Sequence, residues 1–161
     1  MTTEELQPAT TLVPTGSSSR RHVIVPWAAQ LVVAVILAQT LFFKFTYAPE
    51  TRYIFESRGG RPAATLVGLV ELVCVVLLLI PRTAAIGAAL ALAVIGGAIM
   101  THLMSLGIEV KNPDTGEGDG GLLFGLALAV AVGSLVVLAF RWRQLPFIDR
   151  LREGPGVGRV S

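Results

Sequence analysis

Charged residues are scarce in this sequence. Only 15% of its 161 residues are Asp, Glu, Lys or Arg, whereas 53% are hydrophobic. Soluble domains carry about 25% charged residues, so the deficit excludes an ordinary soluble domain. The high apolar content likewise excludes an intrinsically disordered chain. The net charge of +2 is too small to indicate binding to nucleic acid.

Cysteine and histidine are almost absent. Cys74 is the single cysteine, which excludes a disulfide framework, a CxxC redox pair and a multi-cysteine metal or iron–sulfur site within one chain. His22 and His102 fall at opposite sides of the predicted membrane, which leaves no bis-histidine haem site inside one chain. The sequence therefore predicts no haem and no metal site.

Long apolar segments are abundant instead. A bilayer core about 30 Å thick needs about 20 apolar residues in a helix, and four segments meet this requirement. None of them alternates like a β-strand. We therefore predict an all-α, membrane-spanning four-helix bundle over residues 22–143, flanked by a disordered cytoplasmic tail (1–21) and a second cytoplasmic tail (144–161). The predicted spans are 23–43, 62–80, 84–106 and 122–140.

The distribution of basic residues predicts the orientation. With four spans, both termini lie on one side of the membrane, and that side holds eight Lys or Arg residues against five on the other. Cytoplasmic segments carry the excess of basic residues, so we expect both termini in the cytoplasm. On the other side, residues 46–60 are expected to form a short surface helix with Pro49 in its first turn.

Small residues recur every fourth position in two spans. The third span has Ala85, Ala89, Ala93, Gly97 and Thr101, and the fourth has Gly125, Ala129 and Gly133. Because small residues allow helix backbones to approach closely in lipid, these ladders predict tight packing of the third span on the fourth, and leave a homodimer open.

Few polar residues lie within the spans. Glu71 is the sole charged residue deep in a span, where a carboxylate costs about 2.5–3.5 kcal/mol and needs a partner or a proton. Gln39, Thr40, Lys44 and His102 lie in the same outer half of the predicted bundle. We expect these five side chains to converge in one polar pocket. The pocket is either a site for a quinone headgroup, another small ligand or a proton, or a hydrogen-bond cluster that fixes helix register.

Several segments together resemble a known family. They are FFKF at the end of the first span, GLVELVCVVLLLIPR through the second, GGAIMTHLMSLGIEV at the end of the third and GGLLFGLALAV at the start of the fourth. With Lys44, Glu71, the Pro81-Arg82 turn and His102 in this order, the chain resembles the DoxX family over about residues 23–147. The resemblance implies a four-helix bundle in the bacterial inner membrane. It also implies an association with quinol oxidation, thiosulfate:quinone chemistry or oxidative-stress proteins.

The combined prediction is a DoxX-like integral inner-membrane protein. It would be an accessory subunit of a redox or oxidative-stress process that binds a quinone-like ligand near Glu71, without catalytic activity of its own. Its expected partners are the lipid bilayer, a redox or stress-response protein and a second copy of the chain. The alternative is a non-enzymatic membrane anchor or assembly protein without a ligand site. A small-molecule carrier is a weaker third interpretation, because four short spans lack the inverted repeats of secondary transporters.

Overall fold

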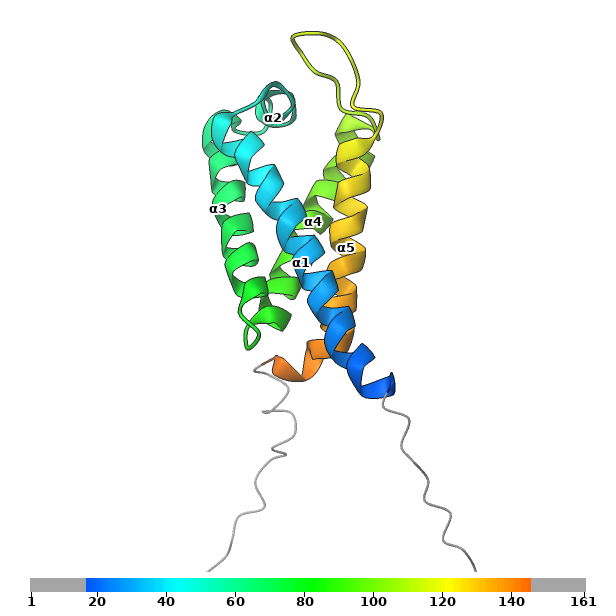
Figure 1. Cartoon of the computed structure of the whole chain (residues 1–161). Coiled ribbons are helices and arrows are strands. Elements are labelled where there is room, and N and C mark those ends of the chain that lie inside the picture. The colour runs from blue at the N-terminus through cyan, green and yellow to red at the C-terminus, as the bar shows by residue number, and fades with distance from the viewer. Residues whose placement is uncertain (1–16, 146–161) are drawn as a thin grey trace, which may run out of the picture.

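The computed structural model describes residues 17–145, and these residues form an antiparallel helical bundle (Figure 1). The five α-helices are α1 (Ser17–Thr46), α2 (Pro49–Phe55), α3 (Gly60–Leu79), α4 (Ala84–Thr101) and α5 (Leu122–Arg141). A π-helical turn, η1 (His102–Leu106), continues α4, and a 3-10 turn, η2 (Trp142–Gln144), follows α5. The predicted all-α four-helix fold is therefore confirmed.

Four of these helices are long and apolar enough to cross a membrane. The candidate spans are Val23–Thr46, Gly60–Leu79, Ala84–Leu106 and Leu122–Arg141. Large apolar side chains on their outer faces, such as Val35, Phe42 and Val132, are more than half exposed. Exposed apolar surface of this extent is typical of contact with lipid, which makes the chain a multi-pass membrane protein.

The first helix begins earlier than expected. It starts at Ser17, so the tail predicted to be disordered over residues 1–21 is wrong for residues 17–21. The prediction counted apolar residues only, whereas the backbone hydrogen bonds of a helix continue into polar residues beyond the bilayer. The remaining parts of the two predicted tails, 1–16 and 146–161, lie outside the described residues.

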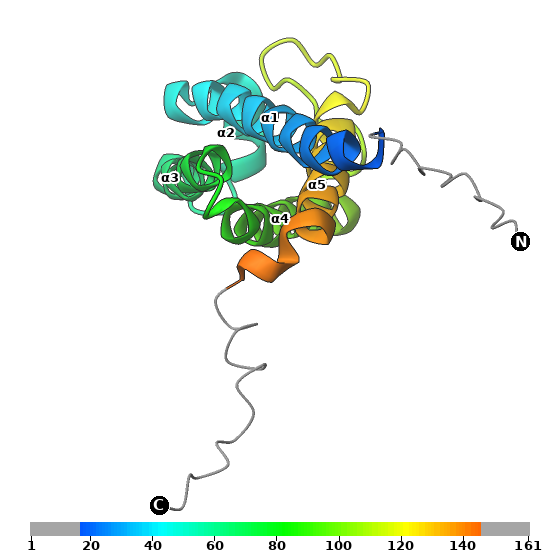
Figure 2. The same cartoon turned by 60° about the horizontal axis from the view of Figure 1, so that its bottom comes forward.

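Each long helix packs against two others in the ring order α1, α3, α4, α5 (Figure 2). We call the end where α1 begins and α5 ends the terminal end, and the end that carries α2 and residues 107–121 the loop end. Gly133 of α5 lies against Val33 of α1 in the terminal half, whereas Gly68 of α3 lies against Phe45 of α1 at the loop end. The first helix therefore crosses from α5 to α3 along its length (Figure 1).

The terminal end is closed by a tight α3–α4 turn. A Cβ atom at Gly87 would lie 2.7 Å from the amide nitrogen of Leu78, so only glycine allows this approach. The carbonyl groups that end α3 have side-chain donors: Thr83 Oγ1 donates to Leu77 O (2.9 Å), and Gln30 Nε2 donates to Leu78 O (2.6 Å). Arg141 Nη1 donates to Pro81 O (2.9 Å) and so connects α5 to the same turn.

The loop end is covered by α2 and the long α4–α5 connection. Tyr47, with a φ of 56°, ends α1 in the left-handed conformation, and Ala48 N–H donates to Phe43 O (3.0 Å). This is the hydrogen-bond pattern of a Schellman motif, and Pro49 then begins α2 as predicted.

Side chains tie α2 to the α4–α5 connection. Asn112 Nδ2 donates to Glu50 Oε1 (3.0 Å), and Arg52 forms an ion pair with Asp114. We call these the α2–loop contacts. They hold the connection beside α2 at the loop end (Figure 1).

Aromatic rings mark both ends of the bundle. The guanidinium of Arg141 lies 5.5 Å from the ring centre of Trp27 at the terminal end. The guanidinium of Arg61 lies 6.0 Å from the ring centre of Tyr47 at the loop end. Such aromatic and basic pairs are typical of the two membrane–water interfaces.

The predicted packing of α4 on α5 is observed, but the small-residue ladders do not form this contact. Ala85 is buried, but Ala89, Ala93 and Gly97 are exposed, and no atom lies within 4 Å of a Cβ built at Gly97. Gly133 packs against α1 instead. Each four-residue step advances about 40° around a helix, so a ladder of five residues turns away from any one neighbour.

Candidate functional site: a cavity in the loop half of the bundle

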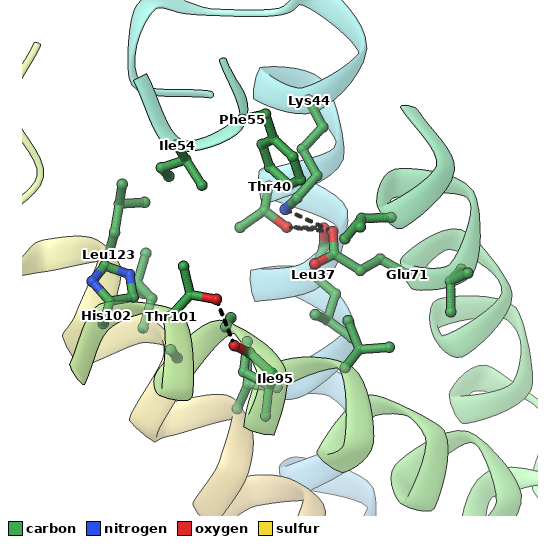
Figure 3. Close-up of a pocket in the computed structure, with 18 of the residues that line it drawn as sticks. Leu37, Thr40, Lys44, Ile54, Phe55, Glu71, Ile95, Thr101, His102 and Leu123 are labelled. Carbon is green, nitrogen blue, oxygen red and sulfur yellow. Dashed lines mark hydrogen bonds and ion pairs between the residues drawn. The ribbon is translucent and has the colours of Figure 1, made fainter. Parts of the chain in front are cut away.

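A cavity of about 550 Å³ lies between the long helices, beneath α2 (Figure 3). Most of its lining is aliphatic, with Leu37, Ile95 and Val130 at buried positions. The polar and charged side chains that line it come from three helices, the segment between α2 and α3, and the π-helical turn: Thr40, Lys44, Arg58, Glu71, Thr101 and His102. An apolar cavity of this size with a few polar groups is the usual form of a small-molecule site.

An ion pair lies in the cavity wall. Lys44 Nζ of α1 is 2.8 Å from Glu71 Oε2 of α3, and the side chains are 15% and 5% exposed. Gly68, one turn before Glu71, makes the pair possible: a Cβ there would lie 3.5 Å from Lys44 Cβ and 3.1 Å from the Phe45 ring. The partner that a buried carboxylate requires is therefore Lys44.

Thr40 completes the group around Glu71. Its Oγ1 lies 3.2 Å from Glu71 Oε2 and 2.8 Å from Leu37 O, and its single hydroxyl proton serves one of these acceptors at a time. Figure 3 shows both Thr40 and Lys44 directed at the Glu71 carboxylate. Within residues 17–145, Glu71 Oε1 has no hydrogen-bond donor, which leaves it able to accept one from a ligand.

His102 lies on the other wall of the cavity, on the π-helical turn that follows α4 (Figure 3). Its Nδ1 is 2.9 Å from Gly107 O. Because a carbonyl oxygen only accepts, Nδ1 carries a proton, and Nε2 is the ring nitrogen that remains for a ligand. The ring is 6% exposed and packs edge-on against Phe124 at 5.5 Å. π-helical turns inside α-helices frequently mark functional sites.

The structure brings four of the five predicted residues to one cavity. Thr40, Lys44 and Glu71 are in contact, and His102 lines the same cavity from the π-helical turn η1. Gln39 is not among them, because it is exposed on the outer face of α1. Gln39 lies about 100° around the helix from Thr40, so the two cannot share one face.

The residue-by-residue prediction missed Arg58, which lines the cavity, and Gln30, which is buried nearer the terminal end and does not line it. Gln30 is fully buried on the same face of α1 as Leu37 and Lys44, at spacings of 7 and 14 residues. This heptad spacing was the available signal. Gln30 Oε1 and Ser134 Oγ are buried atoms without a hydrogen-bond partner in the described part of the chain. Arg58 lies between α2 and α3, and no span pattern could have indicated it.

Asp119 holds the two ends of the α4–α5 connection together. Its carboxylate accepts hydrogen bonds from the N–H groups of Val110 (2.8 Å), Gly121 (3.0 Å) and Leu123 (2.8 Å). Burial alone would raise the pKa of Asp119, but these three donors, with His102 nearby, lower it below its ordinary value. Asp119 thereby fixes the start of α5, which begins at Leu122.

The structure is that of a multi-pass membrane protein with a largely apolar internal cavity. Among residues 17–145 no three His, Cys, Asp or Glu side chains lie close enough to hold a metal ion. Comparison of the chain with protein families, curated proteins and solved structures gives no match.

Proposed function

We propose that the chain is an accessory membrane protein of a redox or oxidative-stress process, of the DoxX type, and that it binds a quinone-like ligand beside Glu71. The observation that carries the proposal is the buried Lys44–Glu71 pair in the wall of a largely apolar cavity of about 550 Å³. Binding sites for small molecules occupy about 300–1,000 Å³, so a quinone ring and part of its side chain fit this volume.

The polar atoms of the cavity suit the oxygen atoms of such a ring. The Lys44 ammonium has three N–H groups, of which Glu71 needs one, so another is available to a ligand carbonyl. Glu71 Oε1 is an acceptor for a ligand hydroxyl group, which the reduced form of a quinone carries, and His102 Nε2 is a second acceptor in the neutral form of the ring. The site therefore offers hydrogen bonds to both forms, with aliphatic side chains around the ring.

Equilibrium binding of decylubiquinone tests the proposal, with the purified protein in lipid nanodiscs. We expect saturable binding to the wild type and at least about tenfold weaker binding to Glu71→Gln, which keeps the shape of the side chain and removes its charge. Gln39→Leu is the matched control on the exposed face of α1 and should bind like the wild type. Unchanged affinity of Glu71→Gln would contradict the proposal.

The same variants separate a ligand site from a structural cluster. If Glu71→Gln lowers the amount of folded protein and the wild type binds no quinone, the ion pair serves only to hold α1 against α3. The chain would then be a membrane anchor or assembly protein. A well-folded Glu71→Gln protein that has lost quinone binding supports the ligand site.

We also propose that the protein resides in the bacterial inner membrane with both termini in the cytoplasm, which the excess of basic residues on the terminal side supports. Single cysteines introduced as Ser57→Cys and Thr115→Cys in a Cys74→Ala background test the orientation. Both positions are exposed at the loop end. A membrane-impermeant maleimide should label them in intact cells, and labelling only after lysis would reverse the assignment.

A further inference from the structure

One side of the cavity is open at the surface. Four of its lining residues are exposed, namely Arg58, Leu66, Ala93 and Gly97. They belong to α3, α4 and the segment after α2, whereas every lining residue of α1 and α5 is buried or half-buried. The cavity wall is therefore continuous along α1 and α5 and interrupted between α3 and α4.

The packing of α3 on α4 explains this opening. The two helices touch at the terminal end, where Gly87 lies against the backbone of Leu78. From that contact α4 inclines toward α5, and its distance from α3 grows toward the loop end (Figure 1). We call the exposed lining residues of the two spans, Leu66, Ala93 and Gly97, the lateral opening.

Small side chains keep the lateral opening free. No heavy atom lies within 4 Å of a Cβ built at Gly97, and the neighbouring member of the ladder, Ala93, adds only a methyl group. The opening lies on apolar spans, so its surroundings are lipid. At the loop end, in contrast, Ile54 and Phe55 of α2 project over the cavity (Figure 3).

We propose that the ligand of this cavity is an amphiphile with a long hydrocarbon tail that enters from the bilayer between α3 and α4. Its polar head reaches the Lys44–Glu71 pair, and its tail occupies the lateral opening at Gly97 and continues into the lipid. This inference rests on the proposed function and adds two features to it. The ligand class requires a tail, and access is from the lipid rather than from water.

Two adjacent glycines of α4 provide a matched test. Gly96 and Gly97 are both exposed helical residues with no atom within 4 Å of a built Cβ, but only Gly97 lines the cavity. A phenylalanine at position 97 would fill the lateral opening, whereas one at position 96 would point away from the cavity. Replacing a helical glycine favours the helix, so both variants should fold.

The experiment measures nanodisc binding of decylubiquinone and of the same quinone ring without its tail. We expect the wild type to bind the tailed probe more tightly. Gly97→Phe should weaken binding of the tailed probe by at least about tenfold and binding of the ring alone by less than about twofold. Gly96→Phe should change neither affinity. Thermal unfolding of each variant verifies the fold.

Each other outcome has a defined meaning. If Gly97→Phe lowers the affinity for both probes equally, the phenylalanine has filled the cavity. If it changes the affinity for neither probe, the tail lies elsewhere. Either result overturns the lateral route while leaving the quinone site intact. If the wild type binds neither probe, the proposed function fails and the lateral route fails with it.

Discussion

Gly87 of α4 lies against the backbone of Leu78 of α3, so closely that a Cβ atom at position 87 would be 2.7 Å from the Leu78 amide nitrogen. This contact sets the distance between the two helices at the terminal end. From there the two helices diverge toward the loop end, where the lateral opening lies (Figure 1).

Substitution of Gly87 should therefore be severe. Gly87→Ala forces α3 and α4 apart, and we expect a loss of about 1–3 kcal/mol in the free energy of unfolding, as for other overpacked sites. Gly96→Ala places the same methyl group in open space on the same helix. It should be neutral or stabilising by up to about 1 kcal/mol. Thermal unfolding in detergent measures both, and equal midpoints for the two variants would contradict the packing described.

The Lys44–Glu71 pair should behave as a unit. Lys44→Met leaves the Glu71 carboxylate, which is 5% exposed, without a counter-charge, and we expect it to cost about 3–5 kcal/mol of stability. In the double variant Lys44→Met/Glu71→Gln no charge remains, so most of that loss should be recovered. A double-mutant cycle by thermal unfolding measures the coupling. Additive effects of the two substitutions would mean that the side chains do not interact.

Asp119 should make the loop end sensitive to acid. Its pKa in the folded protein lies below the ordinary 3.8, so its contribution to stability is present above pH 3.8 and is lost as the pH falls through the folded-state value. Asp119→Asn should thus unfold at a lower temperature than the wild type at neutral pH, and the difference should shrink in acid. Unfolding scans of both proteins across this range provide the measurement. A difference that grows in acid would contradict the assignment.

The α2–loop contacts should affect local order more than global stability. Arg52 and Asp114 are 41% and 54% exposed, and exposed ion pairs contribute about 0–1 kcal/mol. We expect Asp114→Asn to leave the unfolding midpoint nearly unchanged while increasing amide hydrogen exchange in residues 111–118. High salt should reproduce this effect in the wild type, because it screens the pair. Unaltered exchange in the variant would show that Asn112 and Glu50 suffice.

The sequence predicted those parts of the fold that depend on segment length and hydropathy. The four spans follow from local composition, because lipid permits only helices for such segments. The start of α2 follows from Pro49, which suits the first turn of a helix. The beginning of α1 at Ser17 does not, since polar residues outside the bilayer can be helical or not. DoxX family membership and the membrane orientation stay predictions.

The sequence indicated which residues could form the candidate site better than it indicated which way their side chains face. Depth in the span indicated Glu71, Thr40, Lys44 and His102, whereas Gln39 was included by depth alone and faces outward. The helical period combined with depth would have excluded Gln39. The cavity itself depends on how far α4 diverges from α3 (Figure 1), and no pattern along a single helix reveals that distance.

The two kinds of aromatic residue that absorb and fluoresce in the near ultraviolet lie at opposite ends of the bundle. Both tryptophans, Trp27 and Trp142, lie at the terminal end, whereas both tyrosines, Tyr47 and Tyr53, lie at the loop end. None of the four lines the cavity. Tryptophan fluorescence therefore follows unfolding of one membrane face and tyrosine absorbance follows the other, so partial unfolding of a single end can be observed without any introduced label.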